Sequence, residues 1–220
     1  MVCCTRYCAA EAQFDRKRAE SDLRRYLRRG ADPVTRLLLA EVRRLPLQDK
    51  QLLDIGAGIG VIGVELAGNG LASATIVDAS PAYIEMARQQ TEKPYQPRPT
   101  RFLLGDFVLL ADTLSDADVV TMDRVVCCYP DARALLGAAA LKTRQVLAFT
   151  YPQDRWHMRC AFAMQNLFLR LKGNAFRVFV HSPKDFSAAL EDNGLTRIAR
   201  CKTLSWVIDL YGRNLAPQAS

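Results

Sequence analysis

Short runs of consecutive apolar residues alternate along this chain with longer segments in which apolar residues recur every three or four positions. The short runs lack polar alternation, as is typical of parallel strands covered on both faces, and the longer segments have the period of amphipathic helices. The pattern predicts an α/β fold with a mostly parallel seven-stranded sheet that ends in a tightly joined, hence antiparallel, hairpin. The predicted strands are residues 52–54, 74–78, 101–107, 117–123, 145–152, 195–204 and 205–211.

Two helices are predicted before the first strand. One covers residues 12–29 and is stopped by Gly30, and the next begins at Asp32-Pro33, an N-cap followed by proline at the first helical position. We expect residues 1–48 to form an N-terminal helical cover and residues 49–220 to form the main domain. Further helices are predicted at residues 61–67, 80–90, 131–141 and 182–192.

One more predicted helix follows the fifth strand and ends near Gly173. Its apolar residues share one face, and helical spacing favours burial of such a face in the core. The helix is also long enough to cover a binding site. The residues on this face are Cys160, Ala161, Met164, Leu167, Phe168 and Leu171.

The composition is that of one globular domain, because half of the 220 residues are hydrophobic and no apolar run reaches the length of a membrane span. The first residues lack the apolar core of a secretory signal, so we expect a cytoplasmic protein with reduced cysteines. The net charge is +7, and residues 15–44 hold ten Lys or Arg against five acids. Because apolar residues interrupt these charges at helical spacing, a solvated helix face is favoured over a nucleic-acid footprint.

A glycine-rich turn after the first predicted strand carries the strongest chemical signal. In Asp54-Ile55-Gly56-Ala57-Gly58-Ile59-Gly60, the glycines let the backbone turn tightly against a ligand. The residues from Gly58 to Gly63 also satisfy the G-x-G-x-x-G pattern of dinucleotide-binding proteins. The turn alone therefore leaves two kinds of nucleotide-like ligand open.

Three later predicted strands also end at an aspartate, namely Asp78, Asp106 and Asp123. Because the carboxyl ends of parallel strands meet at one edge of an open sheet, these carboxylates should converge with Asp54 on one crevice. Asp78 lies 24 positions after Asp54, close to where a carboxylate is needed to hold a ribose diol.

The ordered series of the glycine turn, Asp78, Gly105-Asp106-Phe107 and Asp123 resembles motifs one to four of class I S-adenosylmethionine-dependent methyltransferases. The resemblance extends from about residue 50 to the C-terminus. It implies a Rossmann-like methyltransferase fold, S-adenosylmethionine as methyl donor and S-adenosylhomocysteine as product. The layout is loosely similar to small-molecule O-methyltransferases of the magnesium-protoporphyrin type, which have an N-terminal helical cover and a helical insertion after the fifth strand.

The resemblance also implies which positions bind the cofactor. The glycine turn would approach the methionine moiety, Asp78 would hold the ribose, and Asp106 would accept from the adenine amino group. The chain at Asp123-Arg124 would meet the methionine amino group, and Tyr26 its carboxylate. The full set is Tyr26, Asp54, Gly56, Ala57, Gly58, Gly60, Asp78, Ala79, Asp106, Phe107, Asp123 and Arg124.

Methyl transfer from a sulfonium is an in-line displacement, so the protein must mainly align donor and acceptor in a site that excludes bulk water. A general base helps only where the acceptor must lose a proton, and the candidates for catalysis are Tyr129 and His157. The cysteines at 127 and 128, and those at 3, 4 and 8, lack the spacing of a metal site, so no metal is expected.

These observations indicate a methyltransferase with a small-molecule acceptor. The N-terminal helices and residues 153–181 should form the acceptor pocket, and the oligomeric state stays open. An RNA or protein methyltransferase is an alternative because of the basic N-terminus, although no Asn-Pro-Pro-Tyr-type motif follows the fourth strand. The further alternatives are a nicotinamide-dependent oxidoreductase and a non-catalytic cofactor-binding subunit.

Overall fold

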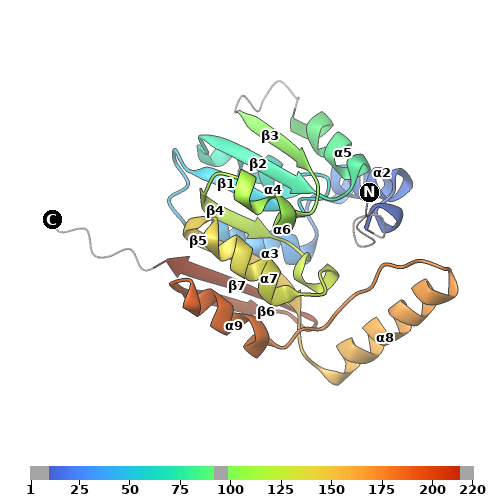
Figure 1. Ribbon diagram of the computed structural model, residues 1–220. Coiled ribbons are helices and arrows are strands. Elements are labelled where there is room, and N and C mark those ends of the chain that lie inside the picture. The colour runs from blue at the N-terminus through green and yellow to red at the C-terminus, as the bar shows by residue number, and fades with distance from the viewer. Residues whose placement is uncertain (1–9, 92–98, 214–220) are drawn as a thin grey trace.

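A computed structural model of the protein describes residues 10–91 and 99–213 and contains the predicted α/β architecture. Seven strands form one sheet in the order β3-β2-β1-β4-β5-β7-β6 (Figure 1). Neighbours from β3 to β5 pair in parallel, whereas β7 pairs antiparallel with both β5 and β6. The strands are β1 Gln51–Ile55, β2 Ser73–Asp78, β3 Thr100–Leu104, β4 Ala117–Met122, β5 Thr143–Pro152, β6 Leu195–Lys202 and β7 Trp206–Arg213.

Helices cover both faces of the sheet, because its central strands are apolar on both sides. One apolar cluster joins α3 and α4 to one face, and a second joins α6, α7 and α9 to the opposite face, which is turned to the viewer in Figure 1. The helices are α2 Arg16–Arg29, α3 Pro33–Val42, α4 Val61–Leu66, α5 Pro81–Thr91, α6 Phe107–Leu110, α7 Ala132–Leu141, α8 Trp156–Leu171 and α9 Pro183–Asp192.

The helix boundaries near the N-terminus follow the predicted caps. The Asp32 side chain accepts from the backbone N–H groups of Val34 and Thr35, and Pro33 is the first residue of α3. Gly30 ends α2 with a φ of 70°. Residues 10–13 form a separate helical turn, since the Asp15 side chain accepts from Arg18 N and begins α2 at Arg16.

Five of the seven predicted strand ends differ from the structure by one to three residues. Asp54 lies inside β1, which ends at Ile55. β3 ends at Leu104, because the Asp106 carboxylate accepts from Val108 N and begins a short helix at Phe107. The segment 176–181 is an extended link between α8 and α9.

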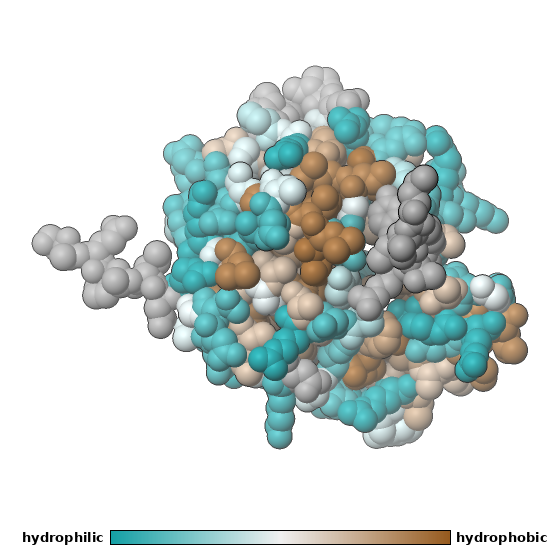
Figure 2. All heavy atoms as spheres, in the orientation of Figure 1, coloured by the Kyte–Doolittle hydropathy of each residue, from teal (hydrophilic) through white to brown (hydrophobic). Residues whose placement is uncertain are grey.

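The predicted burial of the apolar face of α8 was also wrong. This helix projects from the body of the molecule (Figure 1), and most of that face is exposed. The return segment, residues 174–181 after α8, packs instead against the opposite face of α8, where Leu169 contacts Phe176 and Val178. Figure 2 shows another apolar patch in the middle of the visible face, over α6, where Leu109 is 70% exposed.

None of the helices in residues 10–91 and 99–213 is long and apolar enough to cross a membrane. In the same part of the chain Cys127, Cys128, Cys160 and Cys201 carry free thiols. The three N-terminal cysteines, at positions 3, 4 and 8, lie outside the described residues.

Candidate functional site

Two neighbouring cavities lie at the carboxyl ends of the parallel strands. The order of the sheet reverses between β1 and β4, and in open α/β sheets such a switch point is where ligands bind. The larger cavity has a volume of about 490 Å³ and the smaller about 200 Å³. Gly56, Asp78, Ala79, Val125 and Tyr129 are among the residues that line both.

The glycine turn forms the floor of the larger cavity. Gly56 has a φ of 62°, and a Cβ atom added there would lie 2.5 Å from Val125 Cγ2. Gly58 has a φ of 56°, and its N–H donates to Asp78 Oδ2 at 2.8 Å. The left-handed conformation favours glycine at both positions, so the turn exposes backbone to the cavity. Ala57 also lines the cavity.

Gly60 lies outside both cavities. It precedes α4 with a φ of 79°, and an added Cβ would come within 3.1 Å of Ala87 Cβ on α5. In this structure Gly60 therefore allows close packing between the turn and a neighbouring helix.

Asp54 is a fully buried carboxylate on the wall of the larger cavity. Thr121 Oγ1 donates to Asp54 Oδ1 at 2.7 Å, whereas Oδ2 has no hydrogen-bond partner among the described residues. Burial, with a smaller contribution from the Asp123 and Asp78 carboxylates, raises the pKa of Asp54 to about 7, although the hydrogen bond from Thr121 opposes this shift. An unpaired buried carboxylate is costly, so this oxygen is suited to a positively charged ligand group.

Asp78 holds the turn and also faces the cavities. Its two oxygens accept from Gly58 N and Ser80 N, each at 2.8 Å. Burial raises the pKa of Asp78 to about 6, and these backbone hydrogen bonds oppose that shift. The remaining lone pairs of an ionised carboxylate can still accept from a diol.

Asp106 and Phe107 line the smaller cavity. Besides capping α6, the Asp106 carboxylate accepts from the Tyr129 hydroxyl at 3.2 Å and 3.3 Å. Phe107 is buried beside it. A carboxylate next to an aromatic wall fits a flat ring that carries an amino group.

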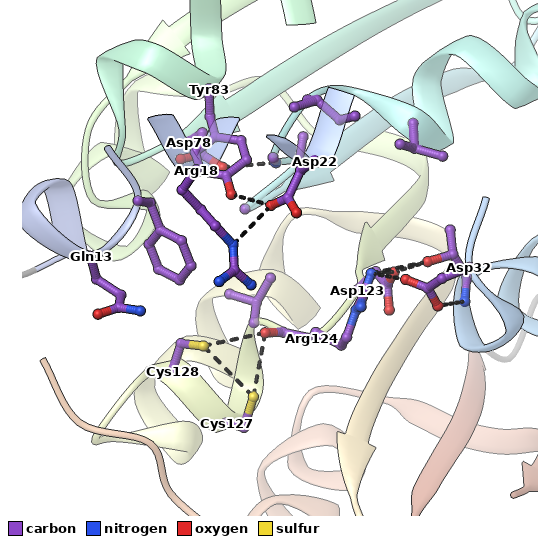
Figure 3. Close-up of a pocket in the computed structure, with 18 of the residues that line it drawn as sticks. Gln13, Arg18, Asp22, Asp32, Asp78, Tyr83, Asp123, Arg124, Cys127 and Cys128 are labelled. Carbon is purple, nitrogen blue, oxygen red and sulfur yellow. Dashed lines mark hydrogen bonds and ion pairs between the residues drawn. The ribbon is translucent and has the colours of Figure 1, made fainter. Parts of the chain in front are cut away.

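Asp123 and Arg124 follow β4 directly and connect its carboxyl end to the N-terminal helices. Thr35 Oγ1 donates to Asp123 Oδ2 at 2.5 Å, and Thr150 Oγ1 donates to Asp123 Oδ1 at 2.7 Å. The Arg124 guanidinium forms ion pairs with Asp32 and Asp123, and Figure 3 shows these three side chains meeting at one end of the cavity. Asp32 and Thr35 were not among the predicted site residues.

Tyr26 also lines the larger cavity. Its hydroxyl donates to Glu65 Oε1 at 3.0 Å, and burial, followed by that carboxylate, raises the pKa of Tyr26 to about 12. Its proton is therefore already directed to an acid. To bind a ligand carboxylate, Tyr26 would have to give up this hydrogen bond.

Residues from the N-terminal segment, α8 and the segment 174–178 form a mixed roof over the larger cavity. Phe14 packs edge-on against Phe176, and Asn174 Nδ2 donates to Gln13 Oε1 at 3.0 Å, so the N-terminal segment meets the return segment after α8. Within the cavity Asp22 accepts from the Tyr83 hydroxyl at 2.6 Å and pairs with Arg18 (Figure 3). Other roof and wall residues are Phe162, Gln165, Val178, Cys127 and Cys128.

The two candidate catalytic residues are not brought together. Tyr129 lines both cavities, whereas His157 lies at the start of α8 and lines neither. His157 Nε2 is buried and has no hydrogen-bond partner among the described residues. Within residues 10–91 and 99–213, no group of three or more His, Cys, Asp or Glu side chains could hold a metal ion.

Comparison with solved structures shows the same fold. Magnesium protoporphyrin IX methyltransferase from Synechocystis PCC 6803, with bound SAH, matches with a TM-score of 0.66 and 21% identity over 82% of each chain. An O-methyltransferase family protein from Burkholderia thailandensis matches with a TM-score of 0.70 and 16% identity, over 94% of this chain and 63% of that one. A candidate RNA methyltransferase from Pyrococcus horikoshii matches with a TM-score of 0.54 and 15% identity, over 83% of this chain and 82% of that one.

Among curated proteins no significant match is found. The family described as "Methyltransferase domain" matches residues 21–199, which is most of the chain and includes the glycine turn and the four aspartates at positions 54, 78, 106 and 123. This family uses S-adenosylmethionine as its methyl donor. The protein therefore belongs to the methyltransferase domain family and is an S-adenosylmethionine-dependent methyltransferase.

Proposed function

We propose that this enzyme methylates a small-molecule acceptor, with the donor held by the glycine turn and the four aspartates. The observation that carries the donor assignment is the unpaired Oδ2 of Asp54, buried on the cavity wall between Asp78 and Asp123. The ammonium group of the methionine moiety supplies the cation that this oxygen lacks. Asp123 would accept from the same ammonium group.

The other parts of the donor follow from the same arrangement. Asp78 would accept from the ribose hydroxyls, and Asp106 with Phe107 would hold the adenine in the smaller cavity. Arg124, which lines the cavity beside Asp123, would pair with the methionine carboxylate. Tyr26 is the less favourable partner for that carboxylate, because its hydroxyl donates to Glu65.

When bound, the donor supplies an electrophilic methyl group on a sulfonium. The protein then has to align the acceptor and exclude water, for which the apolar roof of Phe14, Phe162 and Phe176 is suited. Tyr129 directs its proton to Asp106 rather than to this roof, and His157 lines neither cavity. We therefore assign no general base, and an acceptor oxygen that is already anionic would need none.

Two features support a small molecule over RNA. The larger cavity of about 490 Å³ is in the size range of small-ligand pockets. In addition, many of the arginines of α2 are paired with acids, as in the contacts Arg16–Glu20, Arg18–Asp22, Arg24–Glu20 and Arg25–Asp22. These ion pairs compete with phosphate groups for the same arginines.

Calorimetry tests the donor site. S-adenosylhomocysteine should bind with a stoichiometry of about one per chain, while NAD and NADP should give no heat beyond dilution. An Asp78→Ala variant should lose most of this affinity and still show the circular dichroism spectrum of the wild type. Binding of NAD without binding of S-adenosylhomocysteine would contradict the donor assignment.

The acceptor class is tested by following a labelled methyl group. The enzyme is incubated with tritiated S-adenosylmethionine and either total RNA or a small-molecule extract of cells. Label should appear in the small-molecule fraction, at a rate that depends on enzyme concentration. Label that is found only in RNA would show that the small-molecule assignment is wrong.

A further inference from the structure

The exposed face of α8 is a feature of the molecule that methyl transfer does not explain. One turn of a helix takes 3.6 residues, so residues 156, 160, 164, 167 and 171 lie along the same side. The side chains on this face are Trp156 (77% exposed), Met164 (70%), Leu167 (58%), Phe168 (56%) and Leu171 (79%), together with the exposed Cys160. Soluble monomers seldom leave such a set uncovered.

The opposite face of α8 is already occupied. Asn166 Nδ2 donates to Val178 O at 2.8 Å, and Val178 N donates to Asn166 Oδ1 at 2.9 Å, which fixes the helix to its return segment. Leu169 packs against the same segment, and Phe162 and Gln165 line the larger cavity. If α8 folded onto the body as a lid, these contacts would break. They therefore hold the apolar face of α8 toward solvent.

The charge around α8 has a single sign. Residues 155–184 contain six Lys or Arg and no Asp or Glu. Among the residues that the structure describes, Arg159 is the only one of these six with a carboxylate partner, Asp154 at 2.7 Å. On α2, by contrast, four arginines contact Glu20 or Asp22 of the same helix.

We propose that the outer face of α8 binds the surface of an anionic phospholipid bilayer, with the helix lying in the interface rather than crossing it. Helices of this type combine Trp, Phe and Leu on one face with Lys and Arg beside it. Basic residues gain affinity from the negative surface potential of the lipid. A second copy of this chain fits less well, because two such faces would bring like charges together along the contact.

Co-sedimentation with vesicles tests this proposal. Full-length protein should bind vesicles of phosphatidylcholine with phosphatidylglycerol, and should bind those of phosphatidylcholine alone at least about tenfold less. The double variant Leu167→Glu, Leu171→Glu should lose about tenfold or more of the partition coefficient, because both charges enter the apolar face. Arg170→Glu with Lys172→Glu should weaken binding and flatten its salt dependence.

The matched control is Leu109→Glu, an equally exposed leucine in the patch over α6, which should bind vesicles as the wild type does. All variants are first shown to bind S-adenosylhomocysteine like the wild type, which separates a failure of lipid binding from a failure of the donor site. Absence of wild-type binding to anionic vesicles, or equal binding by the α8 variant, would overturn the proposal. So would a wild-type dimer in sedimentation velocity that Leu167→Glu makes monomeric, since the face would then join two copies.

Discussion

Asp54 links the ionisation of one side chain to donor binding. In the ligand-free protein its pKa is about 7, so below this pH the carboxyl is neutral and attracts an ammonium group weakly. Affinity for S-adenosylhomocysteine should therefore rise about tenfold between pH 6 and pH 7.5, with release of a proton. Calorimetry in two buffers of different ionisation enthalpy measures both effects.

An Asp54→Asn variant is the control for this pH dependence. It should bind more weakly, and its affinity should change little over the same pH range. The pH affects the stability of the ligand-free fold in the opposite direction. Because the pKa of Asp54 is raised in the folded state, this carboxyl favours folding at low pH, and that contribution is lost as the pH rises to about 7. The variant should therefore melt above the wild type at pH 8 without ligand. Parallel pH profiles for the two proteins would refute the assignment.

Gly56 is the position where the turn tolerates a side chain least. A Gly56→Ala variant combines a φ of 62° with a Cβ that would lie 2.5 Å from Val125 Cγ2. The free energy of unfolding should fall by about 1–3 kcal/mol, and the affinity for S-adenosylhomocysteine should fall at least about tenfold. Chemical denaturation and calorimetry measure the two quantities.

Gly137 in α7 provides the matched control, because nothing lies within 4 Å of a Cβ added there. Gly137→Ala should raise the free energy of unfolding by up to about 1 kcal/mol and leave binding unchanged. If both alanine variants behaved alike, the strained geometry assigned to Gly56 would be wrong.

At the scale of elements, the C-terminal hairpin is fixed to β5 by one buried polar network. Arg200 on β6 donates to both oxygens of Asp209 on β7, each at 2.6 Å, and the Tyr151 hydroxyl of β5 donates to Asp209 at 2.8 Å. Arg200→Ala would leave the fully buried Asp209 carboxylate with the tyrosine alone. We expect a loss of about 3 kcal/mol in urea unfolding.

Lys202→Ala on the same strand is the comparison for Arg200, because Lys202 is exposed. It should change the free energy of unfolding by less than about 0.5 kcal/mol. Equal effects of the two substitutions would mean that the network contributes nothing beyond the strand itself.

The sequence predicted those elements whose signals are local. The strands, the caps at Gly30 and Asp32, and the glycine turn depend on neighbouring residues, and all lie close to where the pattern placed them. The hydrogen bond between Thr35 and Asp123 joins residues 88 positions apart, which no periodicity encodes. For α8, helical spacing gave an apolar face but not its direction. The absence of acids in residues 155–184 was the available signal that this face is unlike a core face.

At the scale of the whole molecule, the cavity is enclosed by segments that belong to different parts of the chain. The sheet edge provides the turn and the aspartates, whereas the N-terminal helices and the segment around α8 provide the roof. The division of the chain at residue 48 stays a prediction, but the contacts from Asp32 and Thr35 to the end of β4 couple the two parts at the donor site. Donor binding should therefore stabilise both parts together.

The position of β7 has a consequence for the newly made chain. It is the last described strand to be synthesised, yet it lies inside the sheet, between β5 and β6. Ribosomes add about 5–20 residues per second, so β5 waits for seconds with an open, apolar edge that includes Phe149. Premature termination before Trp206 would leave that edge permanently unpaired, and such edges recruit other chains. The sheet of this protein can therefore close only after the segment from Trp206 to Arg213 has been made.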